Sequence, residues 1–546
     1  MRRAGYAARA LQKRPWQRRV PSELLRSRSS SSLSAYPKLL KFLLFWYFQR
    51  SFKSRVFLKH GPEHPLKIGF VSLGCPKNLV DTEVMMGQLV ADGHELTPRP
   101  ADADVIVVNT CSFIDPAKQE SVDTILEMAE YKKTGKAQRL VVAGCLVERY
   151  RTDIQKNLPE VDAVLGTNEL DKITALCEGM TPKDLAPEPY LYHDLTARVF
   201  TTPRHSAYIK IAEGCDHPCS FCIIPQFRGQ FRSRRFESVI NEATRMLAMG
   251  VREINLIGQD TTCYGEDLGL KDGLAQLMGR LAEIPTELPK WIRVLYAYPN
   301  KVTQKLLETI AAHESLVKYI DMPLQHASAA TLKRMKRGAH GDIFLKLLER
   351  IRATIPGVAI RTSMIVGFPG ETDAEFEELC QFVEAAQFDR LGVFSYSDEE
   401  TSKSFHLDGK VDKRTIYNRK RRLLSIQRRI SLARNKKLIG TEHPVLIEGP
   451  SKETELLWEA RLSTQAPEID GVCYINDFGA DDWGQPRPGE IRKFRITEAH
   501  DYDLIGELVD GPESLYQSPQ KPANLFQILP SGEKTFSRIA PASISL

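Results

Sequence analysis

The chain has 546 residues, of which 42% are hydrophobic and 26% are charged. This length and composition predict an ordinary globular protein of roughly two to four domains with sizeable cores. Ten cysteines are too few for a disulfide-dense secreted scaffold of this size, and the sequence shows no secretory signal. Metal-bound thiolates in a reducing compartment are therefore the better interpretation of the cysteines.

The net charge of +6 is unevenly distributed along the chain. Residues 1–66 hold 15 Lys/Arg and 2 Asp/Glu, a balance of +13, so the remainder carries −7. This basic extension is rich in Arg and Ser and resembles an organellar transit peptide. The alternative, which we favour, is an upstream stretch wrongly included in the reading frame, because convincing domain sequence begins only near Lys67. We expect residues 1–66 to be disordered or not native. In that case the natural protein begins near residues 55–66.

An apolar run at residues 39–48 is the one segment that suggests a membrane. It has about half of the ~20 apolar residues that a bilayer span needs, and Lys41 interrupts it. We therefore expect no membrane span. We expect a cytoplasmic protein, or an organellar one if the extension is a real targeting signal.

Residues 67–180 alternate short apolar runs with helical stretches, which predicts a parallel α/β sheet. Three of the predicted strands run directly into a cysteine, namely Cys75, Cys111 and Cys145. Ligands collect at the carboxyl ends of strands in such sheets, and neighbouring strands lie ~4.8 Å apart. The three cysteines can therefore converge on one small object, and Gly74 and Gly144 leave room for it.

A single cysteine after a buried strand is usually a small hydrophobic residue. Three cysteines in equivalent positions favour a shared ligand instead. Three thiolates suit a 4Fe–4S cluster with one open iron, whereas structural zinc normally takes four protein ligands. Cys177 lies in a helical stretch and is expected to be inert.

The strongest local signal is the spacing Cys-x-x-x-Cys-x-x-Cys at Cys215, Cys219 and Cys222. With 10 cysteines in 546 positions, such a triplet is expected by chance about 0.003 times. A zinc loop is the alternative, but no fourth ligand with finger-like spacing follows. Six apolar runs separated by helical stretches then predict an incomplete (β/α)6 barrel over residues 201–440, open at its strand C-termini. The runs are 207–212, 252–258, 292–298, 317–323, 359–366 and 391–396.

The cysteine triplet, with Phe221 before its last member, resembles the radical S-adenosylmethionine (SAM) superfamily. Further segments resemble the methylthiotransferases within it, and the likeness covers roughly Lys67 to Val509. These segments are Gly69 to Asp81, Leu256 to Asp260, Met322 to Gln325 and Thr362 to Thr372.

Within that family, Leu73 to Asn78 (LGCPKN) resembles the RimO type, which acts on an aspartate of small-subunit ribosomal protein twelve. The tRNA-modifying MiaB type usually has a tyrosine before the glycine, and Gln-Met where Pro76 and Lys77 stand.

The resemblance implies cofactors and roles for the residues that match. Cys75, Cys111 and Cys145 would hold an auxiliary 4Fe–4S cluster, and Cys215, Cys219 and Cys222 the cluster that binds SAM. The implied reaction uses two SAM molecules, one as methyl donor and one as the source of a radical that removes hydrogen from an unactivated carbon. Flavodoxin or ferredoxin would supply electrons, and the sulfur donor stays open. Expected SAM-pocket residues are Gln259, Ser363, Gly367 and Glu371, although a strand-to-helix turn would need Gly367 in any case.

Residues 413–437 read as one long helix with 11 Lys/Arg and an apolar seam of Ile416, Leu423, Ile426 and Ile430. Such a charge run is usually a solvated face, and the alternative is contact with ribosomal RNA phosphates.

Residues 441–510 show five short alternating runs, which predict a small antiparallel β-barrel in the position of a TRAM domain. They hold 16 Asp/Glu and 6 Lys/Arg, a balance of −10, which would repel phosphate and attract a basic protein. A ribosomal protein is thereby favoured as the substrate over tRNA. Residues 511–546, rich in Pro and Ser, are expected to form a disordered tail.

Two other functions compete with this one. A MiaB-type tRNA methylthiotransferase would share the cluster cysteines but should carry a basic last domain. A non-catalytic iron–sulfur sensor would need the cysteines but not the barrel with its SAM-pocket segments.

Overall fold

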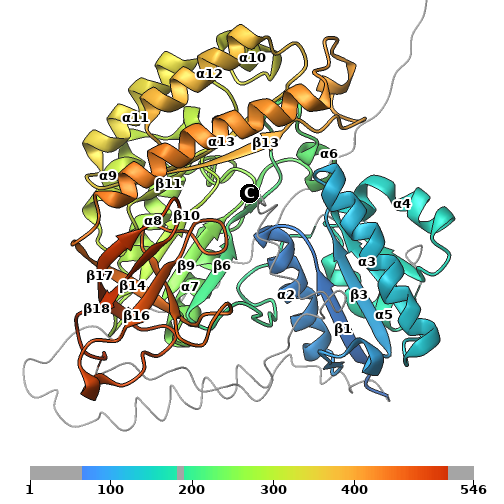
Figure 1. Ribbon diagram of the computed structural model, residues 1–546. Helices are drawn as coiled ribbons and strands as arrows, with labels where there is room; N and C mark the ends of the chain where they lie inside the picture. Colours follow the sequence, from blue (N-terminus) through green and yellow to red (C-terminus); the bar gives the residue numbers. More distant parts are fainter. Residues whose placement is uncertain (1–63, 181–189, 514–546) are drawn as a thin grey trace, which may run out of the picture. The chain divides into compact units, whose positions relative to one another are not determined.

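The structure is a computed structural model that describes residues 64–180 and 190–513 (Figure 1). The predicted N-terminal extension up to residue 63, including its apolar run, and the predicted tail from residue 514 lie outside these residues. Within the described ranges, none of the helices combines the length and the apolar character that a bilayer crossing requires.

The N-terminal domain is built on a five-stranded sheet in which every pairing is parallel, in the order β2-β1-β3-β4-β5. The strands that precede the three cysteines, β1, β3 and β4, are therefore neighbours. Ser72 pairs with Asn109, and Thr110 pairs with Gly144, so the three strands end at the same edge. The strands are β1 (Lys67–Ser72), β2 (Glu95–Leu96), β3 (Val105–Thr110), β4 (Arg139–Gly144) and β5 (Ala163–Leu165).

Helices cover both faces of this sheet (Figure 1). On one face α2 and α5 pack in one apolar core, and on the other α3 and α4 pack in a second core. All six residues of β3 are buried, as expected for a strand of a parallel sheet that is covered on both sides. The helices are α2 (Pro76–Ala91), α3 (Asp115–Thr134), α4 (Cys145–Asn157) and α5 (Ile173–Cys177).

The second domain contains the six parallel strands that the apolar runs predict. They form two three-stranded sheets, β10-β9-β6 and β11-β12-β13, which a parallel bridge between Ile292 and Leu316 connects. This arrangement is the predicted incomplete barrel. Its strands are β6 (Ser206–Lys210), β9 (Glu253–Ile257), β10 (Trp291–Val294), β11 (Tyr319–Asp321), β12 (Ala359–Val366) and β13 (Arg390–Ser395).

Helices follow the strands of the barrel along the chain. The basic helix predicted over residues 413–437 is α13, with Asp412 as its N-cap. Leu423, Ile426 and Ile430 of α13 are buried in the core of the barrel domain, so the predicted seam faces inward. The helices are α6 (Ile224–Arg228), α7 (Phe236–Ala248), α8 (Gly273–Ala282), α9 (Gln304–Ala312), α10 (Ala329–Arg334), α11 (Gly341–Thr354), α12 (Asp373–Ala386) and α13 (Lys413–Lys436).

The last domain is a closed five-stranded barrel in the order β14-β15-β16-β18-β17. Four of its five pairings are antiparallel as predicted, but β16 and β18 pair in parallel. An odd number of strands cannot alternate in direction around a closed ring, so one parallel pairing is unavoidable. The strands are β14 (Glu442–Pro450), β15 (Trp458–Leu462), β16 (Cys473–Asp477), β17 (Ile491–Ala499) and β18 (Leu504–Leu508).

Candidate active site

Three cysteines of the N-terminal domain lie at the carboxyl edge of its sheet. Cys75 is the N-cap of α2, Cys111 follows β3 directly, and Cys145 is the first residue of α4. A side chain at Gly74 would place its Cβ 2.8 Å from Cβ of Cys111, so glycine is needed for this close approach. The positive φ of +86° at Gly74 adds a second reason for glycine.

The electrostatics of these thiols show how closely they are grouped. Burial, together with the neighbouring thiols of Cys145 and Cys75, raises the pKa of Cys111 to about 12. Burial raises the pKa of Cys145 to about 11, although Arg228 acts in the opposite direction. Thiols that disfavour each other's ionisation in this way need added positive charge to become thiolates, and bound iron supplies such charge. The donor set therefore fits a metal cluster.

The second cysteine group lies in the loop between two short strands, β7 (Ala212–Glu213) and β8 (Arg232–Ser233), which pair antiparallel. Burial, with Cys219 and Cys215 as like-charged neighbours, raises the pKa of Cys222 to about 12. Burial also raises the pKa of Cys215 to about 11. The loop follows the carboxyl end of β6, so these three thiols lie where a barrel of this kind binds its substrates.

A buried arginine lies beside the second cysteine group. Nη1 of Arg337 donates to Sγ of Cys219 at 3.6 Å, and its guanidinium lies 4.3 Å from the centroid of the Tyr298 ring. Arg337 is 7% exposed, and no carboxylate in the described part of the chain pairs with it. An unpaired buried cation needs a counter-charge, and thiolates at Cys219 and its neighbours would provide it.

The loop is held against the barrel by His217. Its ring stacks on Tyr298 with centroids 3.7 Å apart, and its Nε2 lies 2.5 Å from Oδ2 of Asp260. Asp260 also accepts hydrogen bonds from Thr262 and from Sγ of Cys263. His217, Asp260 and Cys263 lie close enough to hold an ion, but Asp260 already accepts these four contacts. We therefore interpret this group as a packing contact of the loop.

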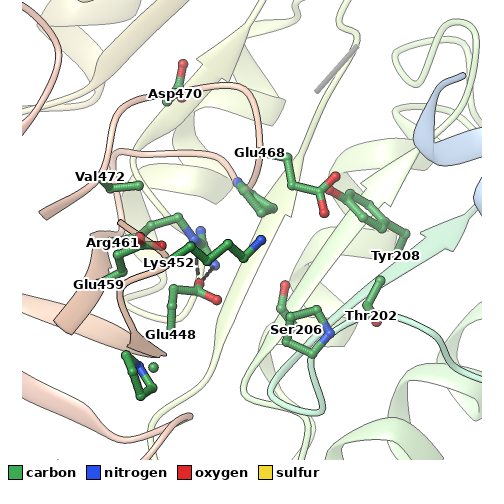
Figure 2. Close-up of a pocket in the computed structure, with 14 residues that line it drawn as sticks. Thr202, Ser206, Tyr208, Glu448, Lys452, Glu459, Arg461, Glu468, Asp470 and Val472 are labelled. Carbon is green, nitrogen blue, oxygen red and sulfur yellow. Dashed lines mark hydrogen bonds and ion pairs between the residues drawn. The ribbon is translucent and has the colours of Figure 1, made fainter. Parts of the chain in front are cut away.

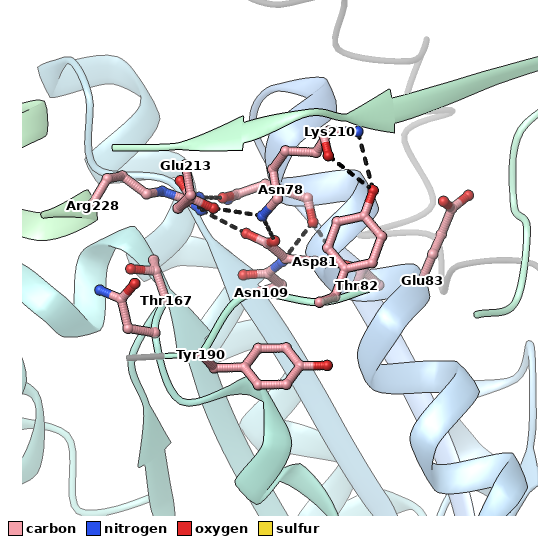
Figure 3. Close-up of polar contacts among 12 residues, drawn as sticks. Asn78, Asp81, Thr82, Glu83, Asn109, Thr167, Tyr190, Lys210, Glu213 and Arg228 are labelled. Atoms are coloured by element: carbon pink, nitrogen blue, oxygen red, sulfur yellow. Dashed lines mark hydrogen bonds and ion pairs between the residues drawn. The ribbon is translucent and has the colours of Figure 1, made fainter. Parts of the chain in front are cut away.

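A buried polar network lies near both cysteine groups, and Figure 3 shows its members Asp81, Lys210, Glu213 and Arg228. Nη2 of Arg228, from the barrel domain, donates to Sγ of Cys145 at 3.3 Å, and its Nη1 donates to Oδ2 of Asp81 at 2.7 Å. Lys210 pairs with Asp81 and with Glu213, which lies two residues before Cys215. Two cations and two anions thus balance in a region where all four side chains are buried.

The predicted SAM-pocket residues divide into two groups. Nε2 of Gln259 donates to Oε1 of Glu213 at 2.6 Å, whereas its buried Oε1 has no hydrogen-bond partner among the described residues. Ser363 lies in β12 and is 8% exposed. Gln259 therefore extends the network toward the second cysteine group and offers a free acceptor there.

Gly367 and Glu371 contact α13. Oε2 of Glu371 accepts from the backbone N–H groups of Gly367 and Phe368, and its Oε1 accepts from Arg419 at 2.9 Å. A Cβ at Gly367 would lie 2.2 Å from Cγ1 of Ile416. These contacts fix the turn after β12 against the helix, which agrees with the purely structural alternative for Gly367.

A separate cavity of about 290 Å³ lies at the opposite end of β6 (Figure 2). Ser206, the first residue of that strand, lines it together with Glu448, Glu468 and Asp470 of the last domain. Because the cysteine loop follows the other end of β6, this cavity is not part of the candidate active site.

Comparison with known proteins identifies the family. A relative from Solibacter usitatus, "Ribosomal protein uS12 methylthiotransferase RimO", is 72% identical over 86% of this chain and 97% of its own length. Proteins of the same name from Koribacter versatilis and Sorangium cellulosum are 57% and 49% identical, over 84% and 82% of this chain and 99% and 92% of their own lengths. The chain belongs to the RimO family of methylthiotransferases.

Matches to individual domains agree with membership in the RimO family. Residues 67–166 match the uncharacterized protein family UPF0004, residues 209–383 the radical SAM superfamily and residues 439–509 the TRAM domain. A solved structure of the radical SAM methyltransferase TsrM from Kitasatospora setae is 14% identical, covers 61% of this chain and 75% of its own, and has a TM-score of 0.46. That likeness is too weak to assign an activity.

The chain is thus a radical SAM methylthiotransferase of the RimO family, an enzyme that uses SAM and a 4Fe–4S cluster. The interpretation as a non-catalytic sensor is not supported.

Sequence reasoning did not identify Arg228, Arg337 or the pair of His217 and Asp260. Asp260 lies in a segment that resembles the family, whereas no sequence signal marks the two arginines.

Proposed function

We propose that this enzyme adds a methylthio group to the β-carbon of an aspartate in ribosomal protein uS12. The observation that carries the proposal is the 72% identity to a relative named for that activity, over almost the whole length of the relative. A tRNA substrate of the MiaB type has no comparable support, because the relatives from three bacteria are all named as uS12 enzymes.

The charge of the last domain supports a protein substrate. Its residues carry a balance of −10, and Arg461, Arg487 and Arg492 are engaged in ion pairs with acidic residues. Acidic side chains such as Glu453, Glu455 and Glu498 are exposed. Such a surface attracts a basic protein and repels phosphate.

We further propose two 4Fe–4S clusters. Cys75, Cys111 and Cys145 would hold the auxiliary cluster, and Cys215, Cys219 and Cys222 would hold the cluster that binds SAM. When bound, the reduced cluster with SAM supplies a radical that can remove hydrogen from an unactivated carbon. The protein's own contribution is position and charge. Arg228 donates a hydrogen bond to Cys145 of the first cysteine group, and Arg337 donates one to Cys219 of the second. Gln259 presents a hydrogen-bond acceptor beside the second group.

Gln259 and Ser363 are the SAM-pocket residues that we propose to contact SAM. Gly367 and Glu371 belong to the same proposed pocket through the turn that they shape after β12.

We propose domain boundaries at residues 67–180, 201–440 and 441–510, and flavodoxin or ferredoxin as the electron donor. Because the relatives are bacterial, we propose a cytoplasmic location, and a transit-peptide role for the N-terminal extension finds no support.

Deleting the gene and weighing the small-subunit ribosomal proteins tests the proposed substrate. We expect uS12 to lose its methylthio mass in the deletion strain and to regain it when the gene is restored. A digest of total tRNA from the same cells is the matched measurement. If uS12 keeps the modification while a tRNA adenosine loses its own, the substrate assignment is wrong.

A further inference from the structure

The N-terminal half of α13 carries a cluster of cations that the proposed function does not use. Lys413, Arg414, Lys420 and Arg421 lie there together with Tyr417, and we call these five residues the α13 patch. Lys413, Arg414 and Arg421 are exposed and Lys420 is half-buried. Tyr417 is 59% exposed, and the guanidinium of Arg421 lies 5.7 Å from its ring centroid.

The other cations of α13, apart from Lys436 at its last position, behave differently, because carboxylates neutralise them. Arg419 pairs with Glu371 and Asp373, and the remaining pairs lie farther along the helix or toward α12. These pairs are Arg422 with Glu377, Arg428 with Asp501, Arg429 with Glu384 and Arg434 with Asp389.

None of the four cations of the α13 patch has a carboxylate partner in the part of the chain that the structure describes. Asp412 is the acidic residue next to the patch, and its side chain accepts the backbone N–H groups of Arg414 and Thr415 as the helix cap. The α13 patch is therefore a local positive surface on a body whose residues after 66 carry −7.

The α13 patch lies at the catalytic end of the barrel. Ile416, within the same helical turn, packs against Gly367, and Arg419 pairs with Glu371 in the turn that follows β12. That turn is at the carboxyl end of the strand, the end at which the cysteine loop follows β6. Figure 1 shows α13 running along β13 with its N-terminal half toward this end. A partner bound at the α13 patch would thus lie at the end of the barrel that carries the cysteine loop.

The chemistry of the α13 patch fits RNA better than a membrane surface or a purely solvated face. A membrane-surface helix needs an exposed apolar face, but the apolar seam of α13 is buried in the barrel domain. A purely solvated helix normally interleaves acidic residues among its cations. Exposed cations with an interleaved aromatic ring are instead typical of surfaces that bind phosphates and stack bases. Lys413 to Arg421 spans about 12 Å of helix, roughly the axial rise of three nucleotides of one strand.

We propose that the α13 patch binds the phosphates of an RNA strand next to the protein substrate. This inference rests on the proposed function and deepens it: the enzyme would bind uS12 more tightly within a ribonucleoprotein than as the free protein. The two charged surfaces then have separate partners. The acidic last domain would face the basic protein, and the α13 patch would face RNA.

The test uses the full-length, cluster-loaded enzyme and small ribosomal subunits from a strain that lacks the gene. The variant K413Q/R414Q/K420Q/R421Q removes the charges of the α13 patch, and R422Q/R428Q/R429Q is the control, because it removes paired cations from the same helix. We expect the patch variant to bind the subunit at least tenfold more weakly, with a salt slope reduced by about 0.7 for each lost phosphate contact on a single strand. The control should stay within about twofold of wild type.

Free uS12 provides the second measurement. The patch variant should modify free uS12 at the wild-type rate, and Y417A should weaken subunit binding while Y417F restores it. Unchanged subunit binding and salt slope in the patch variant would overturn the inference, as would an equal loss in the control. A wild-type enzyme that modifies neither form of uS12 but binds the subunit through the α13 patch would instead overturn the proposed function.

Discussion

Arg228 of the barrel domain donates a hydrogen bond to the sulfur of Cys145 in the N-terminal domain, across 3.3 Å. The same guanidinium pairs with Asp81 of α2 and with Glu213. One side chain therefore connects a proposed cluster ligand of one domain with a carboxylate two residues before a proposed ligand of the other. All of these groups are buried, so the balance of charge among them contributes to holding the two domains together.

Replacing Arg228 with methionine should destabilise the protein strongly. The change leaves Asp81 and Glu213 with Lys210 as their remaining buried cation, and breaking a buried pair costs about 3–5 kcal/mol. We expect a loss of that size in the free energy of unfolding, measured by denaturant titration of the apoprotein. The control is R245M, since Arg245 is 49% exposed and lies 3.9 Å from Asp194. An exposed pair of this kind contributes about 0–1 kcal/mol. Equal losses in the two variants would contradict the proposed role of the network.

Much of this fold could be predicted because local patterns dictate it. The run Val105 to Val108 is apolar throughout and became a fully buried central strand, and the six apolar runs of the barrel all became strands. The grouping of Cys75, Cys111 and Cys145 was predictable because each follows a strand of one parallel sheet, and neighbouring parallel strands end at one edge.

The contacts between domains could not be predicted in this way. Arg228 meets Asp81 across 147 positions of sequence, and Lys210 meets Asp81 across 129. No periodicity or spacing relates such distant residues. Arg337 is one of several basic residues close together in the sequence, so only the packing shows that it is the cation beside Cys219.

Iron content tests the two-cluster proposal. Two 4Fe–4S clusters amount to about eight irons per chain. We expect the anaerobically reconstituted enzyme to reach that value and the variant C75A/C111A/C145A to hold about half of it. The variant C177A is the control, because Cys177 is buried at the end of α5 among apolar residues. Unchanged iron in the triple variant would remove the auxiliary cluster from the proposal.

Arg337 should set the reduction potential of the cluster that we assign to Cys215, Cys219 and Cys222. Reduction adds negative charge to the cluster, and a buried cation beside Cys219 stabilises it. The variant R337Q should therefore lower the potential, by about 60 mV if the reduction equilibrium changes tenfold. A potentiometric titration followed by electron paramagnetic resonance would measure the shift, and R337K should retain most of the wild-type potential. If R337Q leaves the potential unchanged, or shifts the auxiliary cluster equally, Arg337 does not have this role.

The lowered pKa of Glu253 predicts how the free energy of unfolding depends on pH. Burial alone would raise the pKa of Glu253, but Arg461 and Arg293 outweigh it and hold the pKa at about 2. An unfolded glutamate titrates near pH 4.3, so the folded state binds this proton less tightly than the unfolded state. The ionised Glu253 therefore contributes at most about 3 kcal/mol to the free energy of unfolding. This contribution is complete above about pH 5 and is lost as the pH falls toward 2.

The variant E253Q should then lose stability less steeply between pH 5 and 3 than wild type. Its overall stability should fall, because Arg293 loses its carboxylate partner and Arg461 keeps only Glu448. Circular dichroism of thermal unfolding at stepped pH would measure both slopes. E283Q serves as the control, since Glu283 is 55% exposed and pairs with Arg280 at the surface, and it should keep the wild-type slope. A wild-type slope in E253Q would mean that the acid sensitivity arises elsewhere. The contacts between Arg461 of the last domain and Glu253 of the barrel would then contribute to packing without linking stability to pH.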